Sequence, residues 1–380
     1  MEHRALPRYR TGDDALDRRV ADLVAAAGIA DDADLIFELV ASSLRMGREH
    51  VARRELKIAN YALKEMRYAF HVFAPYRHAR KVSVFGSARI QPDDEAYLAA
   101  ARFSEAMADR DWMVMTGAGP GIMAAGIEGA GRDRSFGINI QLPFEQIANS
   151  VIAGDPKLIN FRYFFTRKLT FVKESDGFCL LPGGFGTMDE TFELLTLIQT
   201  GKTSPAPVVL LDPPGSSYWD RWRSFVSEEL LDGGLINERD LGLVFCTDDV
   251  EAAVDEIVGF YRNYHSIRYV GRRLVVRHRA PLSDAELSEL GAEFADIATS
   301  GGFERLEPAP AELADHDVVD LHRFGFRFDQ ASHARLRQLI DRLNALAPAD
   351  LATSGEVVTD DDAERTVAVD RAGLSDNDHP

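Results

Sequence analysis

Apolar residues in the first part of this chain recur at intervals of three and four, the spacing of one helix face. The positions that carry the pattern are Leu35, Ile36, Leu39, Val40, Leu44, Leu56, Leu63 and Met66. Residues 14–27 show a shorter helical pattern, and Pro75 closes the region. We therefore predict an N-terminal helical extension over residues 1–77, with helical structure over 31–73.

Short apolar runs then alternate with helical segments. The predicted strands cover 81–88, 112–116, 135–142, 177–181, 207–211 and 241–246. The predicted helices cover 95–110, 122–129, 157–174, 187–200, 218–231 and 250–264. Strands separated by helices of this length pair in parallel through right-handed crossovers. Residues 78–265 are therefore predicted to form an α/β domain with a doubly wound, mostly parallel, Rossmann-like sheet.

The pattern changes again after residue 265. A strand is predicted over 274–279, a helix over 283–298, a strand or hairpin over 318–328 and a helix over 331–346. These elements predict a small α+β domain over residues 266–350. The last segment, 351–380, is rich in Asp and has almost no apolar periodicity, which is typical of an acidic disordered tail.

Composition narrows the class of protein. The chain has 380 residues, of which 46% are hydrophobic, enough for two or three soluble domains. Its formal charge of −18 argues against a nucleic-acid partner, because such partners require a basic face. The two cysteines, Cys179 and Cys246, lie in apolar runs and are expected to be reduced and buried, without a disulfide or a metal. No apolar run approaches the length of a membrane span, so we expect a cytoplasmic protein.

Three of the predicted strands end in turns that contain glycine. In a doubly wound sheet, ligands bind outside the carboxyl ends of the strands, where the strand order reverses. Glycine lets backbone N–H groups approach a phosphate, and a helix that begins there adds partial positive charge. We therefore expect the three turns to converge on one phosphate-binding crevice. The predicted binding residues are Gly86, Ser87, Gly117, Gly119, Gly121, Gly183, Gly184, Gly186 and Thr187.

Two familiar nucleotide sites do not fit. The turn 117–121 resembles the start of a dinucleotide fingerprint, but its sixth position is Ile122, and strand 135–142 has no acid at its end to hold a ribose. The sequence Gly201-Lys202-Thr203 resembles the end of a P-loop, but the required upstream glycine is replaced by Thr196. NAD binding is therefore weakly supported, and an ATPase loop is rejected.

Charged residues flank the third glycine turn. Arg167 and Lys168 lie on the helical segment before strand 177–181, among apolar residues, so at least one of them is expected to point inward. Asp189 and Glu190 follow the turn on the next helix. A site that only bound phosphate would not place acids beside it. This pairing indicates chemistry next to the anchored group.

These residues match a known family. The stretch Pro182-Gly183-Gly184-Phe185-Gly186-Thr187-Met188-Asp189-Glu190 resembles the PGGxGTxxE signature of the LOG ("Lonely Guy") family, cytokinin riboside 5′-monophosphate phosphoribohydrolases once labelled lysine decarboxylases. The pair Arg167-Lys168 is similar to the family's Arg-Lys pair, and the first two turns fall where the family contacts its nucleotide. The resemblance covers about residues 80–265. The longer ends point to the longer bacterial branch, and the second turn lacks the glycine triplet of short members.

The resemblance implies a hydrolase that cleaves the N-glycosidic bond of a nucleoside 5′-monophosphate, AMP or an N6-modified AMP, to free base and ribose 5-phosphate. Cleavage builds positive charge on the ribosyl ring, so a carboxylate beside the anomeric carbon stabilises the transition state and can activate water. Glu190 is expected to take this role. Arg167 is expected to assist as the second catalytic residue by fixing the nucleotide or the departing base, and Lys168 to bind substrate. No metal or organic cofactor is needed.

The family also implies at least a homodimer, with the site completed near the subunit interface. Two other functions remain open on the sequence. The first is a nucleotide-binding regulator that keeps the phosphate cradle without turnover. The second is a pyridoxal-phosphate lysine decarboxylase, which would require a Schiff-base lysine, for which Lys168 is the candidate near the cradle.

Overall fold

The computed structural model describes residues 7–141, 149–314, 318–348 and 351. The chain divides into two compact units, residues 1–65 and residues 66–379. The segment predicted to be an acidic tail, 351–380, lies outside the described residues except for Leu351. The domain boundaries at 77, 265 and 350 stay predictions.

The first unit is helical. It contains α1 (Asp14–Ala26), α2 (Ala33–Arg48) and the beginning of α3 (Arg53–Phe73). The carboxylate of Asp13 caps α1 by accepting hydrogen bonds from the first turn of the helix. The helical region predicted over 31–73 is interrupted at 49–52, where His50 has a left-handed φ of 53° and ends the second helix before the third begins.

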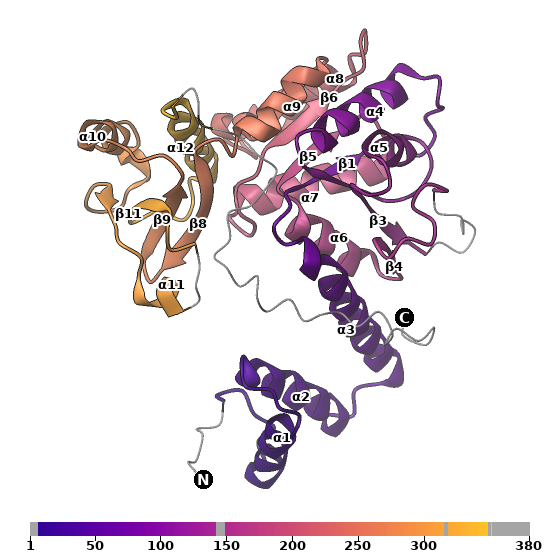
Figure 1. Cartoon of the computed structure of the whole chain (residues 1–380), viewed down its shortest axis with the longest axis vertical. Helices are drawn as coiled ribbons and strands as arrows, with labels where there is room; N and C mark the ends of the chain where they lie inside the picture. Colours follow the sequence, from indigo (N-terminus) through magenta and orange to yellow (C-terminus); the bar gives the residue numbers. More distant parts are fainter. Residues whose placement is uncertain (1–6, 142–148, 315–317, 349–350, 352–380) are drawn as a thin grey trace. The chain divides into compact units, whose positions relative to one another are not determined.

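The second unit is built on a seven-stranded parallel sheet (Figure 1). Its order is β4-β3-β2-β1-β5-β6-β7, so the chain starts in the middle, moves to one edge and returns to the other side of β1. The switch point lies between β1 and β5, and this topology confirms the predicted doubly wound α/β class. The strands are β1 (Lys81–Phe85), β2 (Met113–Thr116), β3 (Ser135–Ile140), β4 (Leu158–Phe161), β5 (Gly177–Leu180), β6 (Val208–Leu211) and β7 (Phe245–Thr247).

Helices cover both faces of this sheet. They are α4 (Glu95–Ala108), α5 (Ile122–Ala130), α6 (Phe164–Glu174), α7 (Phe185–Gln199), α8 (Tyr218–Phe225) and α9 (Val250–Gly259). Alternate strand residues serve opposite faces: Val82, Val84 and Val114 pack with α4, α5 and α9, whereas Met113 and Met115 belong to the core on the other side. That second core contains the end of α3 with residues of α6, α7 and α8. Cys179 is buried as predicted, but Cys246 is only partly buried; both are unpaired.

Several predicted boundaries were wrong. The helix predicted over 157–174 begins only at Phe164, because residues 158–161 pair with β3 as the edge strand β4. The helix predicted to reach 264 ends at Gly259, and the strand predicted over 241–246 is mostly the 3₁₀ turn η3 (Glu238–Leu243) before β7. The helix predicted to reach 231 passes from α8 into a π-helical turn, η2 (Val226–Leu231). In each case tertiary pairing or packing decided between states that short apolar runs leave open.

The small domain is a second sheet with helices. The strands β8 (Tyr264–Val270), β9 (Arg273–His278), β10 (Glu304–Arg305) and β11 (His322–Phe326) form an antiparallel sheet of order β10-β11-β9-β8. Its helices are α10 (Asp284–Glu293), α11 (Pro310–Ala314) and α12 (His333–Ala345), with a short 3₁₀ turn at Ala295–Ile297 (η4). Another 3₁₀ turn, Ala74–Tyr76 (η1), follows α3 outside this domain. Strand β8 was not predicted from the sequence, and the strand predicted over 318–328 is confined to β11. The α+β character is as expected.

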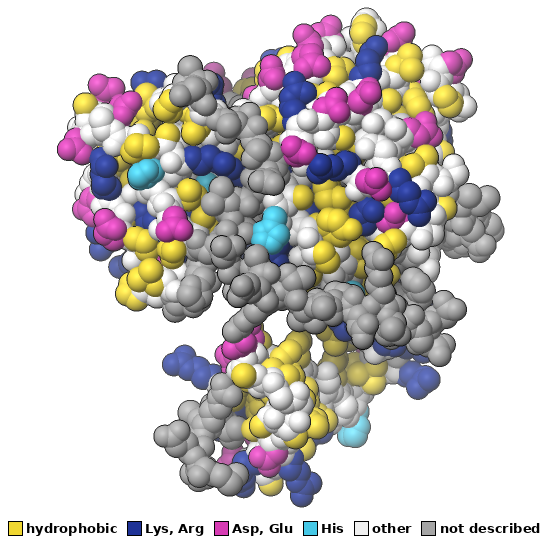
Figure 2. Space-filling model, in the orientation of Figure 1, with side chains coloured by type: hydrophobic (Ala, Val, Ile, Leu, Met, Phe, Trp, Pro, Cys, Tyr) yellow, Lys and Arg dark blue, Asp and Glu magenta, His cyan; other side chains and the backbone are white. Residues whose placement is uncertain are grey.

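Ion pairs stabilise the small domain and join it to α9. Glu312 on α11 accepts hydrogen bonds from Arg277 and Arg323, and all three side chains are buried. Arg337 on α12 pairs with Glu256 on α9. On the face shown in Figure 2, the Lys and Arg side chains lie among Asp and Glu side chains. Among the described residues no helix is both long and apolar enough to cross a membrane.

Candidate functional site

Three glycine turns meet at the carboxyl ends of β1, β2 and β5. The backbone N–H of Ser87 donates to the carbonyl of Pro182 at 3.1 Å, and the N–H of Ile122 donates to the carbonyl of Ser87 at 3.1 Å. These two bonds tie the first turn to the third and to the second. The predicted convergence of the turns is therefore present in the fold, at the switch point where ligands bind in doubly wound sheets.

Close approach explains two of the glycines. Gly121 has a left-handed φ of 67°, and a Cβ there would clash with the backbone of Ser87 and Ala88. A Cβ at Gly183 would clash with the hydroxyl of Thr187, which is buried. The turns can therefore lie against one another only with glycine at these positions.

Two other glycines have no structural reason to lack a side chain. A Cβ at Gly184 or Gly186 would meet nothing within 4 Å, and neither residue has a left-handed φ. Gly186 lies inside the first turn of α7, where glycine is less favourable than alanine by about 1 kcal/mol. Open space in front of an unfavourable glycine is what a ligand that approaches the backbone requires.

Two helices begin at the meeting point of the turns. Helix α5 begins after Gly121 and α7 begins after Gly184, and neither has a side chain that caps its first N–H groups. Uncapped helix N-termini carry partial positive charge and hydrogen-bond donors. Two such N-termini that begin at joined turns make this edge of the sheet suitable for a phosphate group.

The second turn carries backbone strain that the sequence pattern did not indicate. Ala118 is fully buried and has a left-handed φ of 58°, which is rare for a residue with a side chain. The hydroxyl of Thr116 accepts a hydrogen bond from its N–H at 3.1 Å and helps to hold this conformation. The side chain of Met123 extends over Gly117 and Gly119, so that Met123 also lines the turn.

Arg167 lies over the second turn. Its Nε donates to the carbonyl of Ile138 at 2.8 Å, and a Cβ at Gly117 would lie only 2.5 Å from its Nη2. Burial lowers the pKa of Arg167, and the nearby charge of Glu190 partly opposes that effect. The predicted inward direction of Arg167 is therefore present, and a guanidinium stays charged in such a place because its ordinary pKa lies far above neutral pH.

Lys168, the next residue on α6, forms ion pairs with two acids of α7. Its ammonium lies 2.8 Å from a carboxylate oxygen of Asp189 and 2.7 Å from one of Glu193, both on α7. Burial lowers the pKa of Lys168, but the bonds to these two acids outweigh it and hold the pKa above its ordinary value. Asp189, the acid next to Glu190 in the sequence, thus pairs with the lysine of α6.

Glu190 is the acid with the most altered titration at this site. Burial raises its pKa from 4.5 to about 7, although Lys168 and Arg167 partly lower it. The carboxyl group is therefore divided between its two protonation states near neutral pH. Such a group is suited to accept or donate a proton during a reaction.

Tyr218, at the start of α8, is a further site residue that was not predicted from the sequence. Its hydroxyl donates to the carbonyl of Gly183 at 2.5 Å and so supports the third turn from the next strand along the sheet. A groove of about 600 Å³ opens beside it, lined by residues 215–218 and by Arg221, Trp222 and Phe225. Its position after β6, the neighbour of β5, was the available signal in the sequence.

Comparisons with known proteins match the region that contains these residues. A family model described as "possible lysine decarboxylase" matches residues 120–257, which include Arg167, the third turn and Glu190. A cytokinin riboside 5′-monophosphate phosphoribohydrolase of Mycobacterium tuberculosis is 30% identical over 159 residues, or 41% of this chain and 81% of that protein. The chain belongs to the LOG family.

Other similar proteins are less identical in sequence. A probable LOG-family phosphoribohydrolase of Oryza sativa is 28% identical over 160 residues, 40% of this chain and 62% of the rice protein. Among solved structures, the molybdenum cofactor carrier protein of Chlamydomonas reinhardtii is 21% identical with a TM-score of 0.33 over 46% of this chain and 94% of its own. The molybdenum cofactor binding protein of Rippkaea orientalis is 21% identical with a TM-score of 0.33, over 47% and 95%. The match to the Mycobacterium tuberculosis protein leaves more than half of this chain uncovered.

Metal ligation has no support at this site. Within the part of the chain that the structure describes, no group of three or more His, Cys, Asp or Glu side chains is arranged to hold a metal ion. The acids of this LOG site are instead close to cations: Asp189 and Glu193 to Lys168, and Glu190 to both Arg167 and Lys168.

Proposed function

We propose that this LOG-family protein hydrolyses the N-glycosidic bond of a nucleoside 5′-monophosphate, AMP or an N6-modified AMP, and releases the free base and ribose 5-phosphate. The observation that carries the proposal is that Glu190, whose pKa is raised to about 7, lies on the helix that begins at the third of three joined glycine turns. An acid that titrates near neutral pH next to an anion site serves hydrolysis of a phosphorylated substrate.

In this reaction the turns hold the 5′-phosphate through backbone N–H groups and the hydroxyl of Thr187. The bond between C1′ of the ribose and the base nitrogen breaks, and its electron pair leaves with the base. Ionised Glu190 stabilises the positive charge that develops on the ribose and accepts a proton from the water that attacks C1′. The departing base takes up that proton equivalent.

Arg167 and Lys168 have separate tasks in the proposal. Arg167 is fixed by its bond to the carbonyl of Ile138, so its guanidinium holds the nucleotide or the departing base. Lys168 keeps Glu190 partly ionised and holds α6 to α7 through Asp189 and Glu193. The ion pairs of Lys168 argue against a decarboxylase, because a Schiff-base lysine must become neutral and the pKa of Lys168 is raised.

The proposal is tested by incubation with AMP, an N6-isopentenyl AMP, GMP and UMP, with the released base and ribose 5-phosphate measured by chromatography. Glu190→Gln should lower kcat by about a hundredfold or more, the usual loss for a general base. Asp189→Asn, the neighbouring acid on the same helix, is the matched control and should keep most of the rate. Equal base release by wild type and Glu190→Gln would rule out the role of Glu190.

A regulator that binds the nucleotide without turnover is the alternative. It is favoured if calorimetry detects AMP binding that Gly184→Ala weakens, while no base appears over long incubation. The absence of both binding and turnover for every nucleotide tested would contradict both functions.

The proposal includes a homo-oligomer, with the dimer as its smallest form, that acts in the cytoplasm on free nucleotides. Helix α6 exposes Phe164, Phe165 and Leu169, at 52%, 54% and 47% of their surface, and Phe185 at the start of α7 is 96% exposed. A group of exposed apolar side chains on the helices that carry Arg167 and Glu190 favours a partner surface there. A second copy of the chain on this surface would close the site from the open side.

A further inference from the structure

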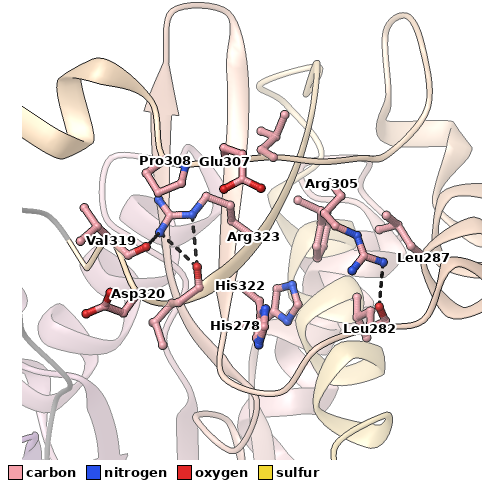
Figure 3. A pocket seen from close by; sticks show the side chains of 13 residues that line it. His278, Leu282, Leu287, Arg305, Glu307, Pro308, Val319, Asp320, His322 and Arg323 are labelled. Carbon is pink, nitrogen blue, oxygen red and sulfur yellow. Dashed lines mark hydrogen bonds between the residues drawn. The ribbon is translucent and has the colours of Figure 1, made fainter.

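A second cavity lies within the small domain (Figure 3). It has a volume of about 210 Å³ and shares no lining residue with the candidate active site. Its walls come from the end of β9, from α10, and from β10 and β11 with the segments next to them. A water occupies about 30 Å³ of liquid, so the cavity has room for roughly seven waters. It is smaller than the pockets of about 300–1,000 Å³ that hold drug-sized ligands.

His278 supplies a hydrogen-bond acceptor to the wall. Its Nδ1 lies 2.7 Å from the carbonyl of Ala280, and because a carbonyl only accepts, Nδ1 must carry the hydrogen. The other nitrogen, Nε2, therefore keeps its lone pair. Burial lowers the pKa of His278 to about 4, and the positive charges of Arg305 and Arg323 and the ring of His322 act in the same direction. The ring is neutral at physiological pH and can accept a hydrogen bond from a ligand.

Two opposite charges stand on the rim of the cavity. Nη2 of Arg305 donates to the carbonyl of Leu282 at 2.8 Å and to the carboxylate of Asp284 at 2.9 Å. These bonds hold the guanidinium at the cavity, while its Nε and Nη1 make no bond to any described residue. Glu307 follows two residues later, and Figure 3 shows its carboxylate near the middle of the rim. Within the described ranges, Glu307 forms no ion pair with Arg305 or with another cation.

The remaining wall includes the apolar side chains of Leu282, Leu287 and Phe324. It also includes Asp320 and Arg323, and Arg323 is paired with Glu312. Two simpler occupants do not fit. A metal ion is not favoured, although the rings of His278 and His322 are 5.8 Å apart, because no metal-competent group of three ligands exists among the described residues. A nucleotide exceeds the volume and would bring its phosphate charge to a rim that also carries Glu307.

We propose that this cavity binds a small zwitterionic metabolite, an α-amino acid with a short apolar side chain. Its carboxylate pairs with Arg305, its ammonium with Glu307 and with Nε2 of His278, and its side chain lies against Leu282 and Leu287. A ligand that carries both charges neutralises Arg305 and Glu307, which form no ion pair with each other. The planar guanidinium suits a carboxylate because it can donate two parallel hydrogen bonds.

The test is calorimetry on the full chain with leucine, valine and alanine, and with isovalerate and isoamylamine, which each lack one charge of a branched amino acid. A branched amino acid should bind, and each single-charge analogue should bind about tenfold more weakly or worse, equal to about 1.4 kcal/mol. Arg305→Gln and Glu307→Gln should each weaken amino-acid binding by a similar factor and leave AMP binding unchanged. This second outcome separates the cavity from the proposed nucleotide reaction.

The matched controls are Arg273→Gln and Glu304→Gln. These residues form an exposed ion pair of 2.9 Å on the same sheet and do not line the cavity, so their loss should leave amino-acid binding unchanged. The proposal is overturned if no amino acid binds at millimolar concentration, or if binding is indifferent to both Arg305→Gln and Glu307→Gln. Tighter binding of adenine than of any amino acid, lost in the same variants, would also overturn the ligand class.

Discussion

The position of Glu190 in the fold changes the pKa of an ordinary carboxyl group. The charges of Lys168 and Arg167 lower its pKa, whereas those of Glu193 and Asp189 raise it. Burial is the largest effect and raises the pKa to about 7. The consequence is a carboxyl group that can change charge at the pH of the cell.

This pKa predicts a pH-dependent stability. The folded protein holds the proton of Glu190 more tightly than the unfolded chain, whose pKa is near 4.5. The contribution of Glu190 to stability is therefore complete below pH 4.5 and is lost as pH rises through about 7. Relative to wild type, Glu190→Gln should gain up to about 3 kcal/mol of unfolding free energy between pH 5 and pH 8. Urea unfolding of both proteins at the two pH values measures this, and a constant difference would contradict the raised pKa.

The glycines allow packing and ligand binding to be separated. Gly117→Ala places a Cβ 2.5 Å from Nη2 of Arg167 and from Sδ of Met123, so both side chains must move. Its kcat/KM should fall because Arg167 is displaced. Gly184→Ala meets nothing within 4 Å, so its Tm should stay near that of wild type, whereas KM for the nucleotide should rise.

Gly302→Ala is the control for this pair, since it also faces open space but lies in the small domain. It should change neither Tm nor KM. If Gly184→Ala leaves KM unchanged as well, the third turn does not approach the substrate.

At the scale of the element, the turn that follows β5 depends on its neighbour after β6. Tyr218→Phe removes the hydrogen bond to the carbonyl of Gly183 and should cost about 1 kcal/mol of stability. Because the bond positions the phosphate turn, KM for the nucleotide should rise more than kcat falls. Tyr97→Phe is the control: it removes a bond of 2.6 Å to Glu128 and should lower stability without moving KM. Equal kinetic effects of the two substitutions would refute the positioning role.

The elements also show what the sequence could and could not predict. The strands of the sheet interior are short buried runs, and three of them, β1, β2 and β5, end in glycine turns. Their order along the chain was enough to predict the doubly wound fold and the convergence of the turns. The edge strand β4 was predicted to be part of a helix, because its four residues are half-buried and only pairing with β3 defines them. Strand β8 was missed for the same reason, since it depends on β9.

Within the site the same limit holds for single residues. Motif spacing along the chain indicates Gly183, Thr187, Arg167 and Glu190, because their chemistry is visible in the sequence itself. Met123, the strained Ala118 and Tyr218 were not predicted. Their contributions come from where a turn or a hydroxyl points, and local spacing does not encode that direction.

At the scale of the whole molecule, the proposed dimer gives the last prediction. Phe165 and Leu169 are one helical turn apart on α6 and expose about half of their surface, so both contact the same partner if one is present. Light scattering at micromolar concentration should give at least a dimer for wild type.

Phe165→Asp should shift the protein toward the monomer, because burial of an unpaired charge at an interface is unfavourable. Leu235→Asp, at a side chain that is 71% exposed in the turn after η2, should leave the mass unchanged. The kinetics add a second readout: if the partner closes the site, Phe165→Asp should lose base release in proportion to the monomer fraction, and activity should return at higher protein concentration. A monomeric wild type with full activity would show that one chain forms the whole site, and that the apolar face of α6 has another purpose.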